Sequence, residues 1–225
     1  MNRSPYPHRF TDLTDALIPV YNWGFRVLGG HSHEAFRQHV VDLAALRGDE
    51  HLLDAGCGTG MLALRIAAQY PGCTVHGVDI SSKMIAVARR DVQEQGLSLD
   101  LRVGSMLELP YPDGIFDVVI TTITYHHLDL AEKRQAVNEI ARVLRDPAPG
   151  QKRPGGRYVS AEFGPRASNA LQRRLAKGEY TLYPSHLTDA GLSIVHEQVG
   201  VLALRKKVVY RVAVKQLLRG RAAAG

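Results

Sequence analysis

The residues LLDAGCGTG at positions 52–60 decide the fold of this 225-residue chain. An apolar run ends at Asp54, three glycines alternate with small residues, and Met61 to Tyr70 follows with a helical pattern. This order predicts a strand, a tight turn and the N-terminus of a helix. Gly56 and Gly58 leave the backbone bare, and the helix directs unpaired N–H groups and its positive dipole end at the turn. The stretch alone fits either a nucleotide-type ligand or a tight structural corner.

The spacing of the glycines narrows the kind of ligand. The dinucleotide-binding fingerprint needs its third glycine where this chain has Met61, and no Lys-Ser or Lys-Thr follows to form a phosphate-binding loop. The turn therefore suits a nucleoside-like ligand without a pyrophosphate. A second predicted strand, Thr74 to Asp79, ends in an acid about twenty residues after the glycines, where such folds bind ribose hydroxyls.

Composition and length are those of one globular α/β domain with a sizeable core. Hydrophobic residues make up 45% of the chain and charged residues 22%. Cys57 and Cys73 are too few for a disulfide framework or a Cys-rich zinc site, so we expect a cytoplasmic protein with no metal. We expect neither a membrane span nor a signal peptide.

The net charge of +6 is unevenly distributed along the chain. Residues 146–225 carry fourteen Lys and Arg against five Asp and Glu. This basic part could attract an acidic substrate, an anionic membrane surface or RNA. It is equally compatible with a solvated basic surface that binds no partner.

Outside the glycine turn, apolar spacing predicts alternating helices and strands. We expect two short helices in residues 10–30, helices over His33 to Leu46 and up to Gln95, and another after Asp129. We expect strands over Leu99 to Val103, Phe116 to Ile123, Arg157 to Phe163, Leu192 to Val199 and Val208 to Val214. Ser81 or Ser82 is a predicted N-cap, Gly96 a predicted C-terminal glycine, and Asp129 with Glu132 a predicted capping box.

Four motifs, taken in order, resemble the class I S-adenosylmethionine-dependent methyltransferases. LLDAGCGTG (52–60) is similar to the first motif of that family and VHGVDIS (75–81) to the second. FDVVITTITYHHL (116–128) resembles the fourth-strand motif, and EIARVLR (139–145) with PGGRYVSAEF (154–163) the helix and fifth strand after it. The resemblance runs from Leu52 to about Glu162 and is specific for the cofactor, not for the methyl acceptor.

The resemblance implies a Rossmann-like α/β fold. Its seven-stranded sheet would have the order 3-2-1-4-5-7-6, with the last strand antiparallel and helices on both faces. We expect an N-terminal helical cap (1–47), an S-adenosylmethionine-binding core (48–215) and a flexible tail (216–225). The Pro- and Gly-rich residues 146–156 would include an exposed insertion of about eight residues, because the family usually passes straight to Pro-Gly-Gly.

The resemblance also implies which residues bind the cofactor. Asp54 would orient the turn and reach the ammonium group, Asp79 would bind the ribose diol, and Thr122 would lie near the sulfur. The full set is Tyr21, Asp54, Gly56, Cys57, Gly58, Thr59, Asp79, Ile80, Met84, Ser105, Met106 and Thr122. Ile80 and Met84 would pack on adenine, although both equally fit a core stripe, and Ser105 stands where the family usually has an acid.

His126 and His127 follow the fourth strand and are the candidate general bases. Ligands bind at the carboxyl ends of parallel strands, and a histidine there can accept a proton near neutral pH. The alternative is structural, with one ring packed on the next helix and the other solvated. Adjacent positions point apart, so a metal is not expected. Cys57 occupies a position where the family needs a small residue, and we do not expect it to be a nucleophile.

The acceptor is expected to be a small apolar or aromatic molecule, such as a quinone precursor. IPVYNWGFRVLGG (18–30) resembles the segment before the core in ubiquinone and menaquinone methyltransferases, which have Tyr-Asp where this chain has Tyr21-Asn22. Aromatic residues that would line the pocket are Phe10, Tyr21, Trp23, Phe25 and those of the segment Tyr180 to Tyr183. No Asn-Pro-Pro-Tyr-like sequence follows the fourth strand, which argues against nucleic acid as substrate. The alternatives are a phospholipid head-group methyltransferase and a non-catalytic S-adenosylmethionine-binding protein.

Overall fold

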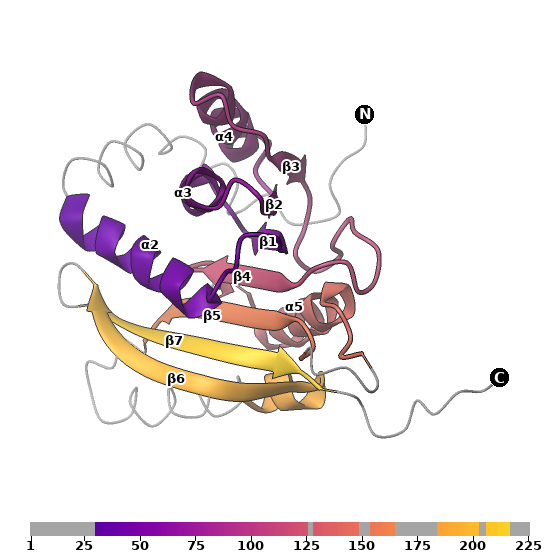
Figure 1. The fold of residues 1–225 in the computed structure, drawn as a ribbon. Coiled ribbons are helices and arrows are strands. Elements are labelled where there is room, and N and C mark those ends of the chain that lie inside the picture. The colour runs from indigo at the N-terminus through magenta and orange to yellow at the C-terminus, as the bar shows by residue number, and fades with distance from the viewer. Residues whose placement is uncertain (1–29, 126–127, 149–153, 165–183, 203–205, 217–225) are drawn as a thin grey trace.

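The structure, a computed structural model, describes residues 30–125, 128–148, 154–164, 184–202 and 206–216, which form a seven-stranded sheet flanked by helices (Figure 1). The strands are β1 (His51–Ala55), β2 (Thr74–Asp79), β3 (Asp100–Val103), β4 (Val118–Thr122), β5 (Arg157–Phe163), β6 (Leu192–Leu202) and β7 (Lys206–Lys215). Their order is β3-β2-β1-β4-β5-β7-β6. The first five strands pair in parallel, and β7 is antiparallel to both β5 and β6. The predicted order and the antiparallel last strand are confirmed.

Helices cover both faces of this sheet. Successive strand residues point to opposite faces, so Leu52 packs with α2 (Gly30–Ala44) and α3 (Met61–Gln69), whereas Leu53 packs with α5 (Leu130–Val143). A further helix, α4 (Ser82–Glu94), packs on β2 and β3. The central strands are therefore buried on both sides, which explains their almost continuous apolar sequences.

The helix ends follow the predicted capping chemistry. Ser81 is the N-cap of α4, and its hydroxyl accepts a hydrogen bond from the Met84 N–H at 3.2 Å. Asp129 and Glu132 form the reciprocal capping box at the start of α5. Gly96 follows α4 with φ +63°, as a C′ glycine requires.

Several predicted boundaries were wrong, for identifiable reasons. The helix expected over His33 to Leu46 spans Gly30–Ala44, because Ala45 adopts φ +47° and ends it. The strand expected over Phe116 to Ile123 is shorter, because Ile123 leaves the extended conformation at φ +51°. β6 is longer than expected and reaches Leu202. Residues 10–29 and 217–225 lie outside the described residues, so the division into cap, core and tail stays a prediction.

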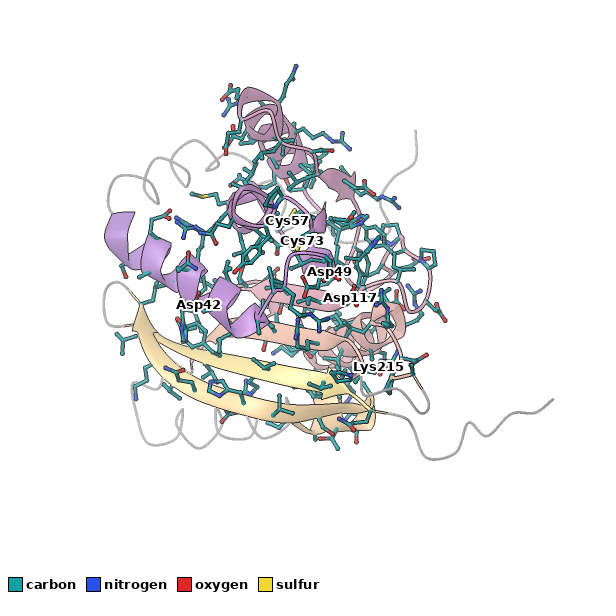
Figure 2. All side chains as sticks on the ribbon, in the orientation of Figure 1. Asp42, Asp49, Cys57, Cys73, Asp117 and Lys215 are labelled. Atoms are coloured by element: carbon teal, nitrogen blue, oxygen red, sulfur yellow. The ribbon has the colours of Figure 1, made fainter. Side chains whose placement is uncertain are left out.

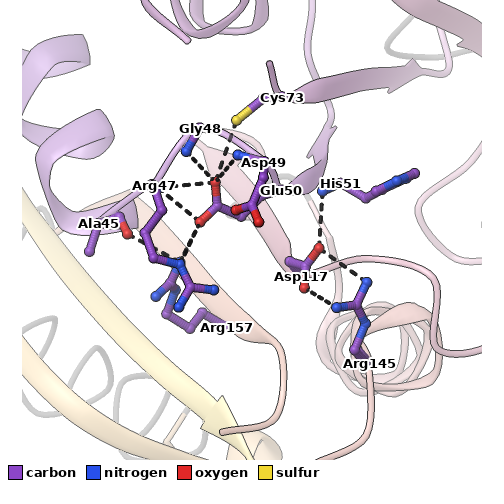
Figure 3. Close-up of polar contacts among 10 residues, drawn as sticks. All are labelled: Ala45, Arg47, Gly48, Asp49, Glu50, His51, Cys73, Asp117, Arg145 and Arg157. Carbon is purple, nitrogen blue, oxygen red and sulfur yellow. Dashed lines mark hydrogen bonds and ion pairs between the residues drawn. The ribbon is translucent and has the colours of Figure 1, made fainter. Parts of the chain in front are cut away.

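A buried carboxylate organises the edge of the sheet where the parallel strands begin. Glu50 is buried, and its side chain accepts hydrogen bonds from the N–H groups of Arg47, Gly48 and Asp49 (Figure 3). Burial raises the pKa of Glu50, but the backbone N–H groups, first those of Arg47 and Gly48, outweigh it and leave that pKa below its ordinary value. This network lies at the N-terminal ends of the strands, so it is structural.

The described ends of the Pro- and Gly-rich loop are tied to the sheet. The Gly156 N–H donates to the Arg145 carbonyl at 2.8 Å. At the end of β7, the Lys215 ammonium (Figure 2) donates to the Leu144 carbonyl at 2.6 Å and pairs with Asp146 at 2.9 Å. Residues 149–153 lie outside the described residues.

Arg142 on α5 joins that helix to the segment that leads into β4. Its guanidinium donates to the carbonyl oxygens of Leu109 (3.0 Å) and Tyr111 (2.8 Å) and to the Glu139 carboxylate (2.7 Å). The two backbone carbonyls belong to a segment with no regular secondary structure, so the arginine supplies donors that a sheet or helix would otherwise supply.

Replacing Arg142 by alanine should therefore lower the free energy of unfolding by about 2–4 kcal/mol, because two carbonyls and two carboxylates, those of Glu139 and Asp113, lose a donor. Urea denaturation of both proteins measures the difference. Arg90→Ala is the control, since Arg90 pairs only with Asp91 and Glu94 at the surface and its loss should leave the midpoint unchanged. Equal midpoints for Arg142→Ala and the wild type would contradict the expected result.

Candidate functional site

The glycine turn between β1 and α3 lies at the carboxyl edge of the sheet. The N–H groups of Gly56 and Cys57 both donate to the Val78 carbonyl on β2, at 2.7 and 3.0 Å. Gly56, Gly58 and Gly60 have φ values of +77°, +54° and +74°. All three are in the left-handed region that favours glycine, so glycine is needed at these positions to allow the backbone conformation of the turn.

The space around the three glycines differs. A Cβ on Gly56 would lie 2.6 Å from the Thr124 hydroxyl, and one on Gly60 would lie 3.0 Å from the Ala88 side chain. An added Cβ on Gly58 would meet no atom of the described residues within 4 Å. Gly56 and Gly60 are therefore required by packing within the fold, whereas Gly58 leaves open backbone for a ligand.

Asp79 ends β2 and holds the glycine turn. One of its carboxylate oxygens accepts the Gly58 N–H at 2.8 Å, and the other accepts the Ser81 N–H at 2.8 Å. An ionised carboxylate offers about four acceptor positions, so a group of this kind can hold a turn and also accept hydroxyl groups of a ligand. The acid thus links the turn, the tip of β2 and the start of α4.

Asp54 on β1 is a buried acid whose loss of hydration is only partly compensated by hydrogen bonds. It is 1% exposed, and its Oδ1 atom has no hydrogen-bond partner among the residues that the structure describes. Burial, and secondly the charge of Asp79, raise the pKa of Asp54 to about 7, against a smaller opposing effect of the Ala63 N–H. A carboxylate in this position is stabilised by any cation that enters the site, which fits an amino-acid ammonium group.

Both cysteines, Cys57 and Cys73, are free thiols and are labelled in Figure 2. Burial, followed by the charges of Asp54 and Asp79, raises the pKa of Cys57 well above its ordinary value. A thiol that stays protonated is a poor nucleophile, so the interpretation of Cys57 as a small residue of the turn fits its surroundings.

The residues predicted to surround the base are spread over the tips of β2 and β3. Ile80 is 45% exposed, and Met84 lies partly buried on the first turn of α4. The Ser105 hydroxyl accepts the Leu107 N–H at 3.1 Å. Met106 is buried in the core cluster on the α5 side of the sheet.

Of the remaining predicted residues, the structure describes Thr122 and Thr59. Thr122 is the last residue of β4 and is partly buried at the carboxyl edge. Thr59, in the glycine turn, is buried. Tyr21, His126 and His127 lie outside the described residues, as do Phe10, Trp23, Phe25 and the segment from 180 to 183. Among the residues that the structure describes, no group of three or more His, Cys, Asp or Glu side chains could hold a metal.

Two further residues, Thr124 and Glu162, meet at this edge, and the sequence does not indicate that they do. Glu162, on β5, is buried and accepts the Thr124 N–H at 3.1 Å. The signal that could have identified it is an acid inside the otherwise apolar strand Arg157–Phe163, since buried acids need partners. Nothing in the sequence indicates which partners it has.

Comparison with known proteins identifies methyltransferases that are related to this chain in sequence. A family model described as "Methyltransferase domain" matches residues 52–147. The chain is 36% identical over 155 residues to the demethylmenaquinone methyltransferase of Thermus thermophilus, covering 69% of this chain and 66% of that protein. It is 30% identical over 209 residues to the 27-O-demethylrifamycin SV methyltransferase of Amycolatopsis mediterranei, covering 81% of this chain and 70% of that protein. The chain thus spans slightly less than two thirds of the Thermus relative.

Solved structures share the fold at low sequence identity. The [4+2]-cyclase SpnF has a TM-score of 0.74 at 20% identity, over 96% of this chain and 98% of that chain. The geranyl diphosphate C-methyltransferase of Streptomyces coelicolor A3(2), solved with S-adenosyl-L-homocysteine, has a TM-score of 0.64 at 19% identity, over 81% of this chain and 79% of that chain. A cyclase and a methyltransferase thus have the same architecture, so this likeness concerns the fold alone.

Proposed function

The chain belongs to the class I S-adenosylmethionine-dependent methyltransferases, and from this premise we propose that it transfers a methyl group from S-adenosylmethionine to a small apolar or aromatic acceptor. The observation that carries the proposal is the glycine turn with an open Gly58 between two acids, Asp54 and Asp79. A nucleoside with a cationic amino-acid group matches this combination of bare backbone, ribose acceptor and buried negative charge.

We assign Asp54, the glycine turn and Asp79 to the amino-acid part and the ribose of the cofactor. The unpartnered oxygen of Asp54 would bind the ammonium group, and the backbone of Gly56, Cys57, Gly58 and Thr59 would line the methionine part. Asp79 would accept the ribose hydroxyls while it holds the turn. Asp79 thus shapes the site and also binds in it.

The remaining predicted residues would surround the base and the sulfur. Ile80 and Met84 would pack on adenine, Ser105 and Met106 would flank it, and Thr122 would lie near the sulfur, with Tyr21 closing the site from the N-terminal segment. The 45% exposure of Ile80, a large apolar side chain, is consistent with a ligand contact. When bound, S-adenosylmethionine supplies an electrophilic methyl group on its sulfonium.

The chain's own task is to position the acceptor and exclude water. Methyl transfer is a direct displacement, so correct orientation can supply roughly 7–11 kcal/mol of the barrier reduction. A base is needed only if the acceptor must lose a proton before it attacks, and His126 or His127 would then take that proton. An aromatic hydroxyl compound such as a reduced quinone precursor fits the predicted pocket and the activity of the Thermus relative, a demethylmenaquinone methyltransferase. Release of S-adenosylhomocysteine with reduced demethylmenaquinone would separate this enzyme from a non-catalytic binding protein.

Equilibrium dialysis with labelled S-adenosylmethionine tests the assignment of Asp79. Asp79→Ala should weaken binding about 100-fold, or ~2.7 kcal/mol, because the ribose hydroxyls lose an ionised acceptor and the Gly58 N–H loses its anchor. Asp100→Ala is the control, since the Asp100 carboxylate binds Arg102 and His76 at the start of β3, remote from the turn. No binding by the wild type, or equal binding by Asp79→Ala, would refute the proposal.

We also propose that the basic C-terminal part contacts an anionic membrane surface. This proposal is supported by the excess of Lys and Arg in residues 146–225. Within the described residues, no helix has the length and apolarity that crossing a membrane requires. The expected cytoplasmic location is likewise a prediction, supported by the two free cysteines.

A further inference from the structure

The backbone directly after β4 is strained. Ile123 has φ +51°, a conformation that a β-branched residue rarely adopts, and its N–H donates to the Ala161 carbonyl on β5 at 2.9 Å. Such strain persists only where the surrounding contacts enforce it, and it is concentrated at functional sites. Ile123 lies at the carboxyl edge of the sheet, one residue after Thr122.

The strained residue directs the chain over the glycine turn. The Thr124 side chain packs so closely on Gly56 that an added Cβ there would lie 2.6 Å from the Thr124 hydroxyl oxygen and 2.7 Å from its methyl carbon. The segment after β4 and the proposed methionine end of the cofactor site therefore share one wall. A small displacement of Thr124 would change the shape of that site.

Two side chains hold this segment in place. The Glu162 carboxylate, 7% exposed, accepts the N–H groups of Thr124 at 3.1 Å and Tyr125 at 2.9 Å through a single oxygen. The Tyr125 hydroxyl donates to the Lys133 carbonyl on α5 at 2.5 Å. Glu162 accepts two backbone N–H groups of this segment, whereas the Tyr125 hydroxyl makes one bond, so Glu162 is the main anchor.

We propose that Glu162 is a positioning residue of the methyl-transfer site. It acts through the backbone of Thr124 and Tyr125 and keeps Thr124 against Gly56 while the chain continues toward His126. This inference rests on the proposed function, because it places the anchored segment beside the reacting methyl group. It does not require Glu162 to touch either substrate.

Two substitutions separate this role from general stabilisation. Glu162→Ala removes the acceptor, whereas Glu162→Gln keeps a side-chain carbonyl that can accept the same two N–H groups. The matched control is Glu139→Ala, since the Glu139 carboxylate also accepts a backbone N–H, that of Leu109 at 2.8 Å, but lies outside the site. A purely structural role for Glu162 would make its two variants resemble Glu139→Ala.

Amide hydrogen exchange measured by NMR tests the anchor without any acceptor. Exchange at Thr124 and Tyr125 should be at least tenfold faster in Glu162→Ala, largely restored in Glu162→Gln and unchanged in Glu139→Ala. Unchanged exchange at both amides in Glu162→Ala would overturn the inference.

Kinetics test the positioning role. The dissociation constant of S-adenosylmethionine should stay within about threefold of the wild type in Glu162→Ala, while kcat with reduced demethylmenaquinone falls about 10- to 100-fold, since displacements near 1 Å cost on that order. Glu162→Gln should recover most of the rate, and Glu139→Ala should turn over normally. A wild-type kcat in Glu162→Ala would overturn the positioning role. Absence of cofactor binding by the wild type would instead refute the proposed function, and the exchange measurement would still decide whether Glu162 anchors the segment.

Discussion

Replacing Asp54 by asparagine should stabilise the cofactor-free protein above pH 7 and at the same time weaken its binding of S-adenosylmethionine. The two effects have opposite signs because one buried charge causes both. Without the cofactor, the ionised carboxylate is desolvated and lies near Asp79, and one of its oxygens has no partner within the described ranges. With the cofactor, the same charge faces a cation.

The sign of the stability effect follows from the raised pKa. Asp54 has a pKa of about 7 in the folded protein against 3.8 for the unperturbed group, so the folded state binds more protons between those values. The stability associated with protonated Asp54 is complete below about pH 4 and is lost as pH rises through 7. A shift of about three units corresponds to roughly 4 kcal/mol. Asparagine avoids this loss but buries an amide, so we expect a net gain of about 1–3 kcal/mol at pH 8.

Chemical denaturation of the two cofactor-free proteins at pH 5.5 and pH 8 measures this effect. The difference should be small at the lower pH and should grow toward the higher one. Asp117→Asn is the comparison, because the Asp117 carboxylate is paired with Arg145 and accepts the His51 N–H, so its neutralisation should destabilise the protein. A less stable Asp54→Asn protein at pH 8 would show that the charge is compensated in the folded state.

The binding effect has its own pH signature. Wild-type affinity for S-adenosylmethionine should fall below about pH 7, by up to tenfold per unit, because Asp54 must lose its proton to pair with the ammonium group. Asp54→Asn should bind at least tenfold more weakly at pH 8 and lose this dependence. Titration calorimetry in buffers of different ionisation heat would also detect the released proton. The same pH dependence in both proteins would remove Asp54 from the ammonium site.

Replacing Gly58 by alanine should abolish cofactor binding while leaving the fold almost intact. Gly58 has φ +54°, so a side chain costs about 1–2 kcal/mol in strain, but an added Cβ would meet nothing within 4 Å in the part of the chain that the structure describes. It would instead stand in the space assigned to the methionine part. We expect at least a 100-fold loss of affinity with only a small loss of stability.

Gly114→Ala is a matched control for this experiment. Gly114 has φ +68°, an added Cβ there also meets nothing within 4 Å, and the residue lies on the loop before β4. Both variants should lose similar stability in denaturation, but only Gly58→Ala should lose binding in dialysis. Equal affinities in the two variants would place the cofactor elsewhere.

Much of the fold could be predicted because its determinants are local. Glycine at positive φ, the Ser81 cap and the capping box of Asp129 with Glu132 each depend on residues within a few positions, so their patterns are visible in the sequence. The boundaries at Ala45 and Ile123 could not be predicted. At Ile123 the left-handed conformation is held by a contact with a segment distant in sequence, the hydrogen bond to Ala161.

For the site, the sequence by itself determined which residue types meet at the carboxyl edge: a glycine turn, Asp54 before it and Asp79 at the tip of the next strand. Only the tertiary structure decided what each does there, namely that Gly56 packs on Thr124 whereas Gly58 stays open, that Asp54 is left partly unpaired, and that Glu162 holds the segment after β4. The physical reason is that residue identity and spacing set backbone shape, whereas burial, charge proximity and free space depend on neighbours that only the folded chain brings together.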